Sequence, residues 1–429
     1  PIMAAWISLI SGVKFFDWLG NIVLQGSLKL GTPIILVIFG SMFAKVIQKT
    51  GISDAIIKKA AEFAGDKPLA IAILMTAATA FIFLGMSGLG AVIMIGSIAI
   101  PIMTSAGIEP IDAVILILLG LGLGISFNFS SLATGIGIFG SEAVLKYYLP
   151  AGIISLIITA AYILINIPRG KISIKSTLEM LKSFILGLIT VPISILKTLI
   201  KNFSRKKSSL IKKKEELPSA ALITPILPLL IVGIGAFTVG LGSPNDGLID
   251  PVSIAVLGFI FAAFYAALMV RPSQSVQLFT GALVEGIQDV AGVLFLFMGI
   301  GMLVTSATQP EAIKILDPMM RAVFPNSFYG MLIFFAIFAP TALYRGPFNM
   351  YGMGTGIATI LMSLNFLPPT ALYGMFNAVG NIQGADPTNS QNTWLGGFAG
   401  VDTTDILKKM LPYSWFGCIL MLICVAIMH

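Results

Sequence analysis

Long, uninterrupted apolar runs recur from one end of this chain to the other and limit the folds that it can adopt. Two examples are TPIILVIFGSMFAKV (32–46) and SLIITAAYILINI (155–167). Only 10% of the residues are charged, whereas soluble domains carry about 25%. Continuous runs are typical of membrane-spanning helices, while the strands of a membrane barrel alternate over short segments. We therefore expect an all-α polytopic membrane protein surrounded by membrane lipid.

Basic residues are concentrated between two apolar halves. The segment 169–216 carries 12 of the 26 Lys and Arg residues. Loops rich in Lys and Arg stay in the cytoplasm, so this bias explains the net charge of +7 without a nucleic-acid partner. Within the segment, SFILGLITVPISIL (183–196) is too short to span a membrane and indicates an interfacial helix. The chain thus divides into a first transmembrane repeat (1–168), a basic cytoplasmic linker (169–216) and a second transmembrane repeat (217–429), as a multi-pass protein of the inner or plasma membrane.

The two halves share landmarks in the same order. Pro110 and Pro369, which each precede an apolar helix, lie 259 residues apart. The segment 45–67 contains five lysines, whereas the matching segment 305–326 contains only one Lys and one Arg. Opposite charge bias in equivalent loops indicates an inverted repeat, as in many secondary transporters. Because the second half begins with two further helices, we also expect the first half to lack its leading helix.

Four breaks interrupt the apolar sequence, two in each half. Two resemble hairpin tips, around Gly85–Gly90 and Arg345–Asn349, and two lie within helices, around Ser126–Ser131 and Gln383–Thr393. Non-helical backbone is tolerated at membrane depth only where protein or a water-filled cavity surrounds it. A broken helix offers free N–H groups to an anion and free C=O groups to a cation. We therefore predict one re-entrant hairpin and one broken transmembrane helix in each half; an extramembrane loop is the alternative for the last break.

Two charged residues in these breaks are the sharpest candidates for a binding site. Arg345 could hold a carboxylate through two parallel hydrogen bonds, or it could anchor a helix end at the membrane surface. Asp386 is either a ligand for a coupling cation or a carboxylate that carries a proton. Thr388 and Asn128 are the neutral residues predicted to bind the coupling ion with it. The other predicted substrate-binding residues are uncharged donors and acceptors of the four breaks: Ser87, Asn128, Ser130, Ser131, Asn349, Asn389, Ser390 and Asn392.

Other acidic residues have simpler interpretations. Glu285 and Asp289 lie four residues apart on one helix face, where they are either interfacial or part of the site. Asp112 occupies a typical first-turn position after a helix-starting proline. Asp405 precedes Lys408 at a spacing that favours a local ion pair on a helix.

Several function classes are excluded by what the sequence lacks. Its one histidine, His429, is the last residue, so the chain has no His-rich metal site, and no serine has a plausible base beside it. The glycines of GLGLG (120–124) follow no strand, so they indicate close helix packing and not a nucleotide site. We expect no enzymatic activity and no cofactor, other than Na⁺ in a sodium-coupled carrier.

This pattern of breaks resembles the ion transporter superfamily of bacterial carboxylate carriers, which includes citrate–proton/metal symporters and divalent-anion–sodium symporters. The resemblance rests on two hairpin-like segments and two segments like broken helices, and SQNTWLGGFAGV followed by LPYSW is closest to the citrate branch. It implies a homodimer and an elevator-like movement. The four segments are GMSGLGAVIMIGSIAIPIM (85–103), RGPFNMYGMGTGIATILM (345–362), SFNFSSLATGIG (126–137) and ADPTNSQNTWLGGFAGV (385–401).

The expected function is therefore secondary active transport. The solute would be a small organic anion, a carboxylate such as citrate or a dicarboxylate, moved by alternating access and coupled to H⁺ or Na⁺. Two alternatives stay open: a cation/proton antiporter of the same superfamily, and the membrane subunit of a carboxylate transporter that depends on a binding protein.

Overall fold

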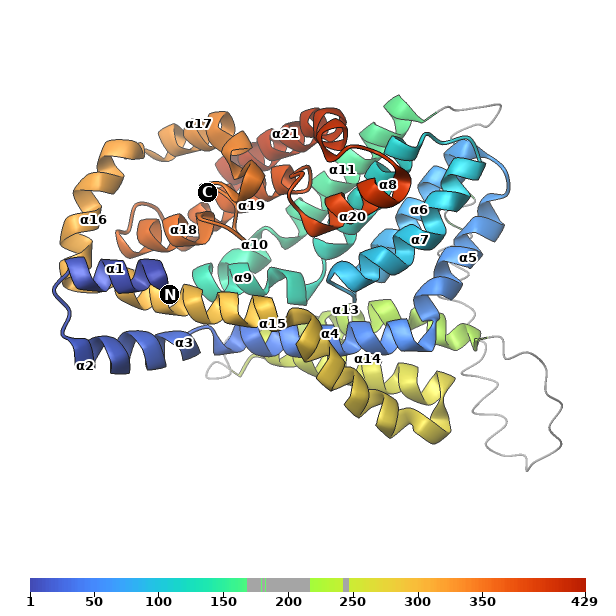
Figure 1. Cartoon of the computed structure of the whole chain (residues 1–429), viewed down its shortest axis with the longest axis horizontal. Coiled ribbons are helices and arrows are strands. Elements are labelled where there is room, and N and C mark those ends of the chain that lie inside the picture. The colour runs from blue at the N-terminus through green and yellow to red at the C-terminus, as the bar shows by residue number, and fades with distance from the viewer. Residues whose placement is uncertain (168–178, 180–181, 183–216, 242–246) are drawn as a thin grey trace.

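The computed structural model of the chain consists of helices packed side by side (Figure 1). It describes residues 1–167, 179, 182, 217–241 and 247–429. Within these ranges, seven helices are long and apolar enough to cross a membrane, and a bent pair adds an eighth if it is one span. The protein is thus an all-α, multi-span membrane protein, as the apolar runs predict. The interfacial helix expected at 183–196 lies outside the described residues.

Three long helices, here called the frame, run along one side of the molecule. They are α4 (Gly31–Thr50), α14 (Pro251–Val270) and α15 (Ser275–Ala307), and α4 packs against both of the others (Figure 1). The 33 residues of α15 extend about 50 Å at 1.5 Å per residue, more than a membrane span requires. The elements beside the frame are α1 (Ile2–Ile10), α2 (Phe15–Asp17), the π-helix η1 (Trp18–Gln25), α3 (Gly26–Leu28), the 3₁₀ helices η2 (Ser219–Ile226) and η4 (Pro272–Gln274), and α13 (Leu227–Thr238).

The first half continues as a hairpin followed by a broken helix. Helices α6 (Pro68–Phe83) and α7 (Leu89–Ser105) form hairpin 1, and residues 84–88 between them are tip 1. Helices α8 (Pro110–Ile125) and α9 (Phe129–Phe139) meet at an angle of 57°, and residues 126–128 between them are break 1. The other helices of this half are α5 (Ile52–Ala64), α10 (Ser141–Lys146) and α11 (Tyr148–Asn166).

The second half has the same order of elements. Hairpin 2 consists of α17 (Phe328–Phe338), η5 (Ala339–Arg345) and α18 (Gly354–Ser363), and the turn from Arg345, the last residue of η5, to residue 353 is tip 2. Helices α19 (Pro369–Gln383) and α20 (Ser390–Ala399) follow, with residues 384–389 as break 2. The other helices are α16 (Pro310–Val323) and α21 (Thr403–Met428). Helices α6, α7 and α18 are shorter than a span, which suits the arms of a re-entrant hairpin; the re-entrant course and the inverted repeat stay predictions.

Prolines and polar caps determine where these helices begin. Pro68, Pro110 and Pro369 each stand at the first position of a helix, where the missing N–H would have had no intrahelical partner. Asp402 precedes α21 and accepts a hydrogen bond of 2.7 Å from the N–H of Thr404. This bond lowers the pKa of the Asp402 carboxyl from its ordinary value, since it stabilises the charged form.

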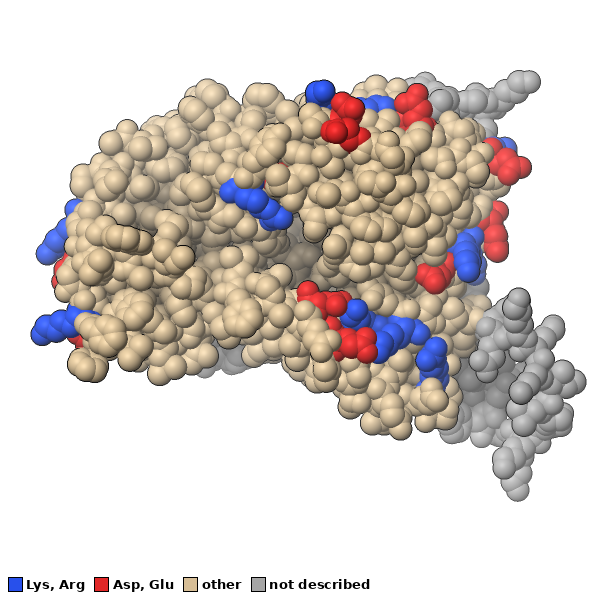
Figure 2. Space-filling view, in the orientation of Figure 1, with Lys and Arg blue, Asp and Glu red and all other residues tan. Residues whose placement is uncertain are grey.

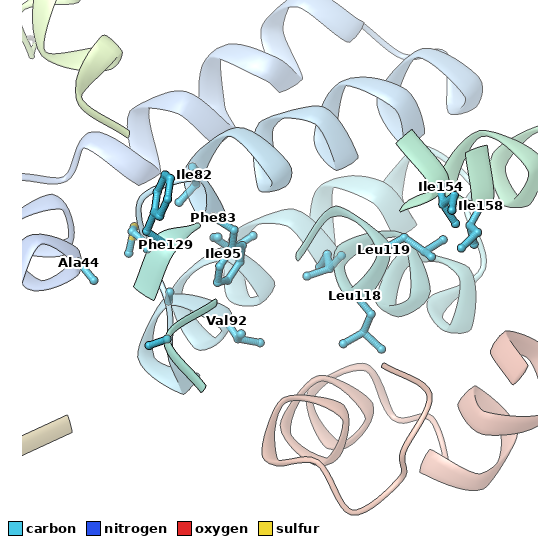
Figure 3. Close-up of a cluster of buried hydrophobic side chains, with 14 of the residues drawn as sticks. Ala44, Ile82, Phe83, Val92, Ile95, Leu118, Leu119, Phe129, Ile154 and Ile158 are labelled. Carbon is cyan, nitrogen blue, oxygen red and sulfur yellow. The ribbon is translucent and has the colours of Figure 1, made fainter. Parts of the chain in front are cut away.

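Small residues allow the broken helix to pack closely against hairpin 1. A Cβ atom on Gly120 of α8 would lie only 2.7 Å from the carbonyl oxygen of Thr76 on α6, and Gly124 faces α6 one turn later. Figure 3 shows Phe83, Ile95 and Phe129 gathered in the apolar cluster where hairpin 1 meets the break. Gly120 and Gly124 therefore serve helix packing, as their sequence context predicts.

The two halves interlock through their broken helices. Helix α9 packs against α18 and α19 of the second half, whereas α20 packs against α7 and α8 of the first. Asn128 in break 1 and Asp386 in break 2 are both fully buried. In the same segment Thr388, Ser390 and Thr393 are exposed, so the extramembrane loop stays the alternative for 383–393.

The breaks are shorter than the polar sequence indicates. Ser130 and Ser131 lie in the first turn of α9, and Ser390 and Asn392 lie in the first turn of α20. Polar side chains fit there because the first N–H groups of a helix have no intrahelical partner. Polarity in these segments therefore extends past the end of each break.

Candidate functional site

Asn128 ties tip 1 to break 1. Its Nδ2 donates hydrogen bonds to the carbonyl oxygens of Phe83, at 3.1 Å, and Met86, at 2.9 Å. Its Oδ1 accepts a hydrogen bond of 2.9 Å from the N–H of Ser130 and so caps α9. One neutral side chain thus holds the hairpin tip against the start of the second half-helix.

Asp386 ties tip 2 to break 2 in the same place of the second half. Its Oδ1 accepts hydrogen bonds from the N–H of Thr388, at 2.9 Å, and from the Thr388 hydroxyl, at 2.7 Å. Its Oδ2 faces the backbone N–H of Arg345, at 3.3 Å, and Nδ2 of Asn349, at 3.5 Å. The four donors satisfy a carboxylate that is fully buried.

The residues of these two contacts are separated by nearly the same number of positions along the chain. Met86 and Arg345 lie 259 residues apart, the same offset as Pro110 and Pro369, and Asn128 and Asp386 lie 258 apart. The direction of the hydrogen bond is reversed: the Asn128 side chain donates to tip 1, whereas the Asp386 side chain accepts from tip 2. In each half a side chain of the break therefore bonds to the backbone of the hairpin tip, as the donor in the first half and as the acceptor in the second.

Asn349 joins tip 2 to η5 within hairpin 2. Asn349 Nδ2 donates to the carbonyl oxygen of Ala342 at 3.0 Å, and Ala342 lies 259 residues after Phe83, an acceptor of Asn128. The Oδ1 atom of Asn349 accepts from the N–H of Tyr351 at 2.9 Å. Asn349 is therefore occupied in shaping tip 2.

The side chains of two asparagines form hydrogen bonds to the backbone at break 2. Asn389 Nδ2 donates to the carbonyl oxygen of Gln383 at 2.6 Å, and Asn392 Nδ2 donates to that of Gly384 at 2.9 Å. Oδ1 of Asn392 and Nε2 of Gln383 are buried and have no hydrogen-bond partner among the described residues. Break 2 thus retains one unused acceptor and one unused donor, and such buried groups call for a ligand or a water molecule.

The side chain of Arg345 is exposed beside this contact. Its guanidinium forms no ion pair with any residue in the described ranges. Tyr344 and Arg345 both have positive φ angles, 55° and 57°, a backbone conformation that residues with a Cβ atom rarely adopt. The guanidinium predicted to bind a carboxylate is therefore exposed, and its residue has a rare backbone conformation.

The predicted serines lie around the two tips in different settings. Ser87 is half-buried in tip 1, and Ser390 is exposed at the start of α20. Ser130 is buried against Gly40 of the frame. The carbonyl oxygen of Ser131 accepts a hydrogen bond of 3.5 Å from the hydroxyl of Tyr351, which brings tip 2 to the first turn of α9. Tyr351 was not predicted, because aromatic residues are common throughout the chain.

A row of ion pairs lies beside hairpin 1. Lys45 of α4 pairs with Asp289 of α15 at 2.7 Å, and Lys49 pairs with Glu285 one turn away. Figure 2 shows acidic and basic side chains gathered where α4 and α15 cross, below a hollow in the centre of this face. A Cβ atom on Gly90 would lie 3.9 Å from Oδ2 of Asp289. The ion pairs thus join two frame helices and border hairpin 1.

Other parts of the molecule do not form the predicted site. A cavity of about 600 Å³ lies away from both tips, and none of the predicted residues lines it. No group of three His, Cys, Asp or Glu residues that could hold a metal occurs in the part of the chain that the structure describes. The cavity is lined by Asn21, Gln25, Leu28, Lys29, Thr305 and Gln309.

Comparison with known proteins identifies the fold. No protein-family model matches the chain, and no curated protein matches it either. A solved structure, the YdaH transporter of Alcanivorax borkumensis, superimposes with a TM-score of 0.63 at 14% sequence identity, over 96% of this chain and 87% of that one. The chain therefore has the fold of a solved membrane transporter, extended over nearly its whole length.

Proposed function

We propose that this protein is a secondary active transporter for a small organic anion, a carboxylate such as citrate or a dicarboxylate, coupled to H⁺ or Na⁺. The observation that carries the proposal is the pair of buried contacts by which Asn128 and Asp386 each join a hairpin tip to a broken helix. The likeness of the fold to a solved transporter supports it. Transporters commonly bind their substrate and coupling ion at discontinuous helices.

The anion would be held by Arg345 and by free N–H groups. The guanidinium of Arg345 can donate two parallel hydrogen bonds to one carboxylate, and its side chain is exposed and has no ionic partner among the described residues. Helices α9 and α20 begin beside the two tips, and their positive ends favour a second negative group. Ser87, Ser131 and Ser390 are neutral groups that could complete such a site.

The coupling ion would act at Asp386. This carboxylate is fully buried and bonds to both tip 2 and break 2, so a change in its charge would be transmitted to the hairpin. An intramembrane acid of this kind is by default a candidate for ion coupling. Thr388, which donates to it twice, would orient the carboxylate.

The proposal is tested by ligand-dependent thermal stability of the purified protein. We expect citrate or a dicarboxylate to raise the melting temperature, because a ligand at a hundred times its Kd stabilises the folded state by about 2.7 kcal/mol. Arg345→Ala should abolish that rise and leave the unliganded protein folded. The matched control is Arg321→Ala, which removes an exposed arginine paired with Asp317 and should leave the ligand response intact.

Other outcomes separate the alternatives. Stabilisation by Na⁺ or Li⁺ alone would favour a cation/proton antiporter. No stabilisation by any small carboxylate would contradict the organic-anion proposal, and an unchanged carboxylate response in Arg345→Ala would remove this residue from the site.

A further inference from the structure

The cavity of about 600 Å³ beside the frame is lined by polar side chains that the proposed transport site does not use. Its volume is within the range of small-molecule sites. Asn21 and Gln25 of η1 and Lys29, directly after α3, follow one another at intervals of four residues, and residues four apart lie on one side of a helix. Thr305 of α15 and Gln309 also line the cavity.

Two glycines hold the walls of this cavity together. Helix α3 packs against α15 (Figure 1). A Cβ atom on Gly301 of α15 would collide with the carbonyl oxygen of Gly26, and a Cβ atom on Gly26 would lie 3.2 Å from Oγ1 of Thr305. The two backbones are therefore in direct contact beside Gln25 and Thr305, and the cavity is bounded by closely packed helices.

The polar groups of the cavity are available to a ligand. The side chains of Asn21, Gln25 and Lys29 form no hydrogen bond or ion pair within the part of the chain that the structure describes. Gln309 uses one N–H of its carboxamide, which donates to the carbonyl oxygen of Thr305 at 3.2 Å. No acidic residue is among the described residues that line the cavity. One ammonium and several N–H donors thus face the same space, a set that suits an anion.

The cavity lies at the depth expected of lipid headgroups. Helix α15 is about 50 Å long, whereas the hydrocarbon core is about 30 Å thick, so its ends reach beyond the core. Helix α16 begins at Pro310, directly after Gln309, and charged residues recur along it, as in a helix at the membrane interface. Thr305 and Gln309 therefore stand where the chain leaves the apolar layer. The charged residues of α16 are Glu311, Lys314, Asp317 and Arg321.

Apolar side chains border the polar ones on the same helix. Leu24 and Leu28 are 63% and 65% exposed, and Leu28 lines the cavity. A soluble anion would contact the polar groups and leave these leucines unused. A phospholipid would contact both, because its phosphodiester is an anion and its acyl chains are apolar. Basic pockets between spanning helices are known to bind anionic headgroups.

From these observations we infer that this cavity binds the headgroup of an anionic phospholipid. The ammonium of Lys29 pairs with the phosphodiester, the carboxamides of Asn21 and Gln25 donate to the oxygens of the headgroup, and the acyl chains lie along Leu24 and Leu28. The bound lipid joins η1 and α3 to α15. This inference goes beyond the proposed function, because the cavity lies away from both tips and its occupancy can be measured without a transported solute.

The test counts lipids that stay bound to the full-length, delipidated protein in native mass spectrometry. The protein in detergent is titrated with phosphatidylglycerol, which has a net charge of −1, or with phosphatidylcholine, which has the same phosphodiester but no net charge. We expect the first phosphatidylglycerol to bind with an affinity higher by about fivefold, as one lysine near a membrane surface provides. Equal affinity for the two lipids would overturn the inference.

Two variants assign the binding to the cavity. Lys29→Met should lower the affinity for phosphatidylglycerol to that for phosphatidylcholine. Gln25→Leu keeps the ammonium and removes one carboxamide, so it should lower the affinity severalfold; it serves if Lys29→Met fails to fold. The matched control is Lys14→Met, since Lys14 is an exposed lysine of the same N-terminal segment that does not line the cavity. Unchanged binding in either cavity variant, or an equal loss in Lys14→Met, would contradict the assignment.

A competition experiment separates the lipid from a soluble anion of the same chemistry. Inorganic phosphate in large excess should leave phosphatidylglycerol bound, because it has no acyl chains to contact the leucines. Displacement by phosphate would identify a site for a soluble anion and overturn the lipid assignment.

Discussion

At the scale of single residues, Asp386 shows what sequence reasoning can reach. A carboxylate within apolar sequence predicts a buried functional group, and its burial is confirmed. Its contact with the backbone N–H of Arg345, 41 residues earlier in the chain, could not be predicted. Every residue except proline has such an N–H, so a backbone partner leaves no mark in the sequence.

Asp112 is another residue whose local role was predicted and whose long-range partner was not. It lies in the first turn of α8, as expected, but its carboxylate also pairs with Lys409 of α21 at 2.5 Å and accepts from the hydroxyl of Tyr162 at 2.6 Å. Its side chain is 5% exposed. This pair joins the two halves at the start of one broken helix.

We predict that Lys409→Met lowers stability strongly. Removing one partner of a buried ion pair leaves the other charge without compensation, at a cost of about 3–5 kcal/mol. The control is Lys408→Met, since Lys408 forms an exposed pair with Asp405 at 3.2 Å, and exposed pairs contribute about 1 kcal/mol or less. Thermal unfolding of the two variants measures the difference; equal melting temperatures would show that the Asp112 pair does not hold the halves together.

At the scale of helices, the sequence predicts the existence of an element more accurately than its boundaries. Prolines at 110 and 369 marked two helix starts correctly, because proline suits the first helical position. The sequence predicts that Ser130 and Asn392 belong to breaks, whereas both lie within helices. Composition cannot separate the first turn of a helix from the loop before it, since both accept polar side chains.

Helix packing gives a sharp test at this scale. Gly120→Ala would place a methyl group 2.7 Å from the backbone oxygen of Thr76, and overpacking of this kind costs about 1–3 kcal/mol. Gly122→Ala is the matched control, because a Cβ atom there meets no atom within 4 Å and alanine favours helices. We expect a lower melting temperature for Gly120→Ala and an unchanged or higher one for Gly122→Ala; the opposite order would contradict the packing of α8 on α6.

At the scale of the whole molecule, the sequence predicted two halves with the same order of elements. The structure adds that α9 and α20 each pack into the other half, a feature that arises from the tertiary fold and has no local sequence signal. The internal symmetry itself stays a prediction, although the matched contacts of Asn128 and Asp386 are what such symmetry would produce. The homodimer and the elevator-like movement implied by family resemblance also stay predictions.

The central claim is tested most directly by uptake of a radiolabelled carboxylate into proteoliposomes under imposed ion gradients. We predict that citrate or a dicarboxylate accumulates faster than in protein-free liposomes, that an inward proton or sodium gradient drives the accumulation, and that Arg345→Ala abolishes it. The account would be contradicted if, for every carboxylate that binds, no ion gradient raised uptake above that of protein-free liposomes.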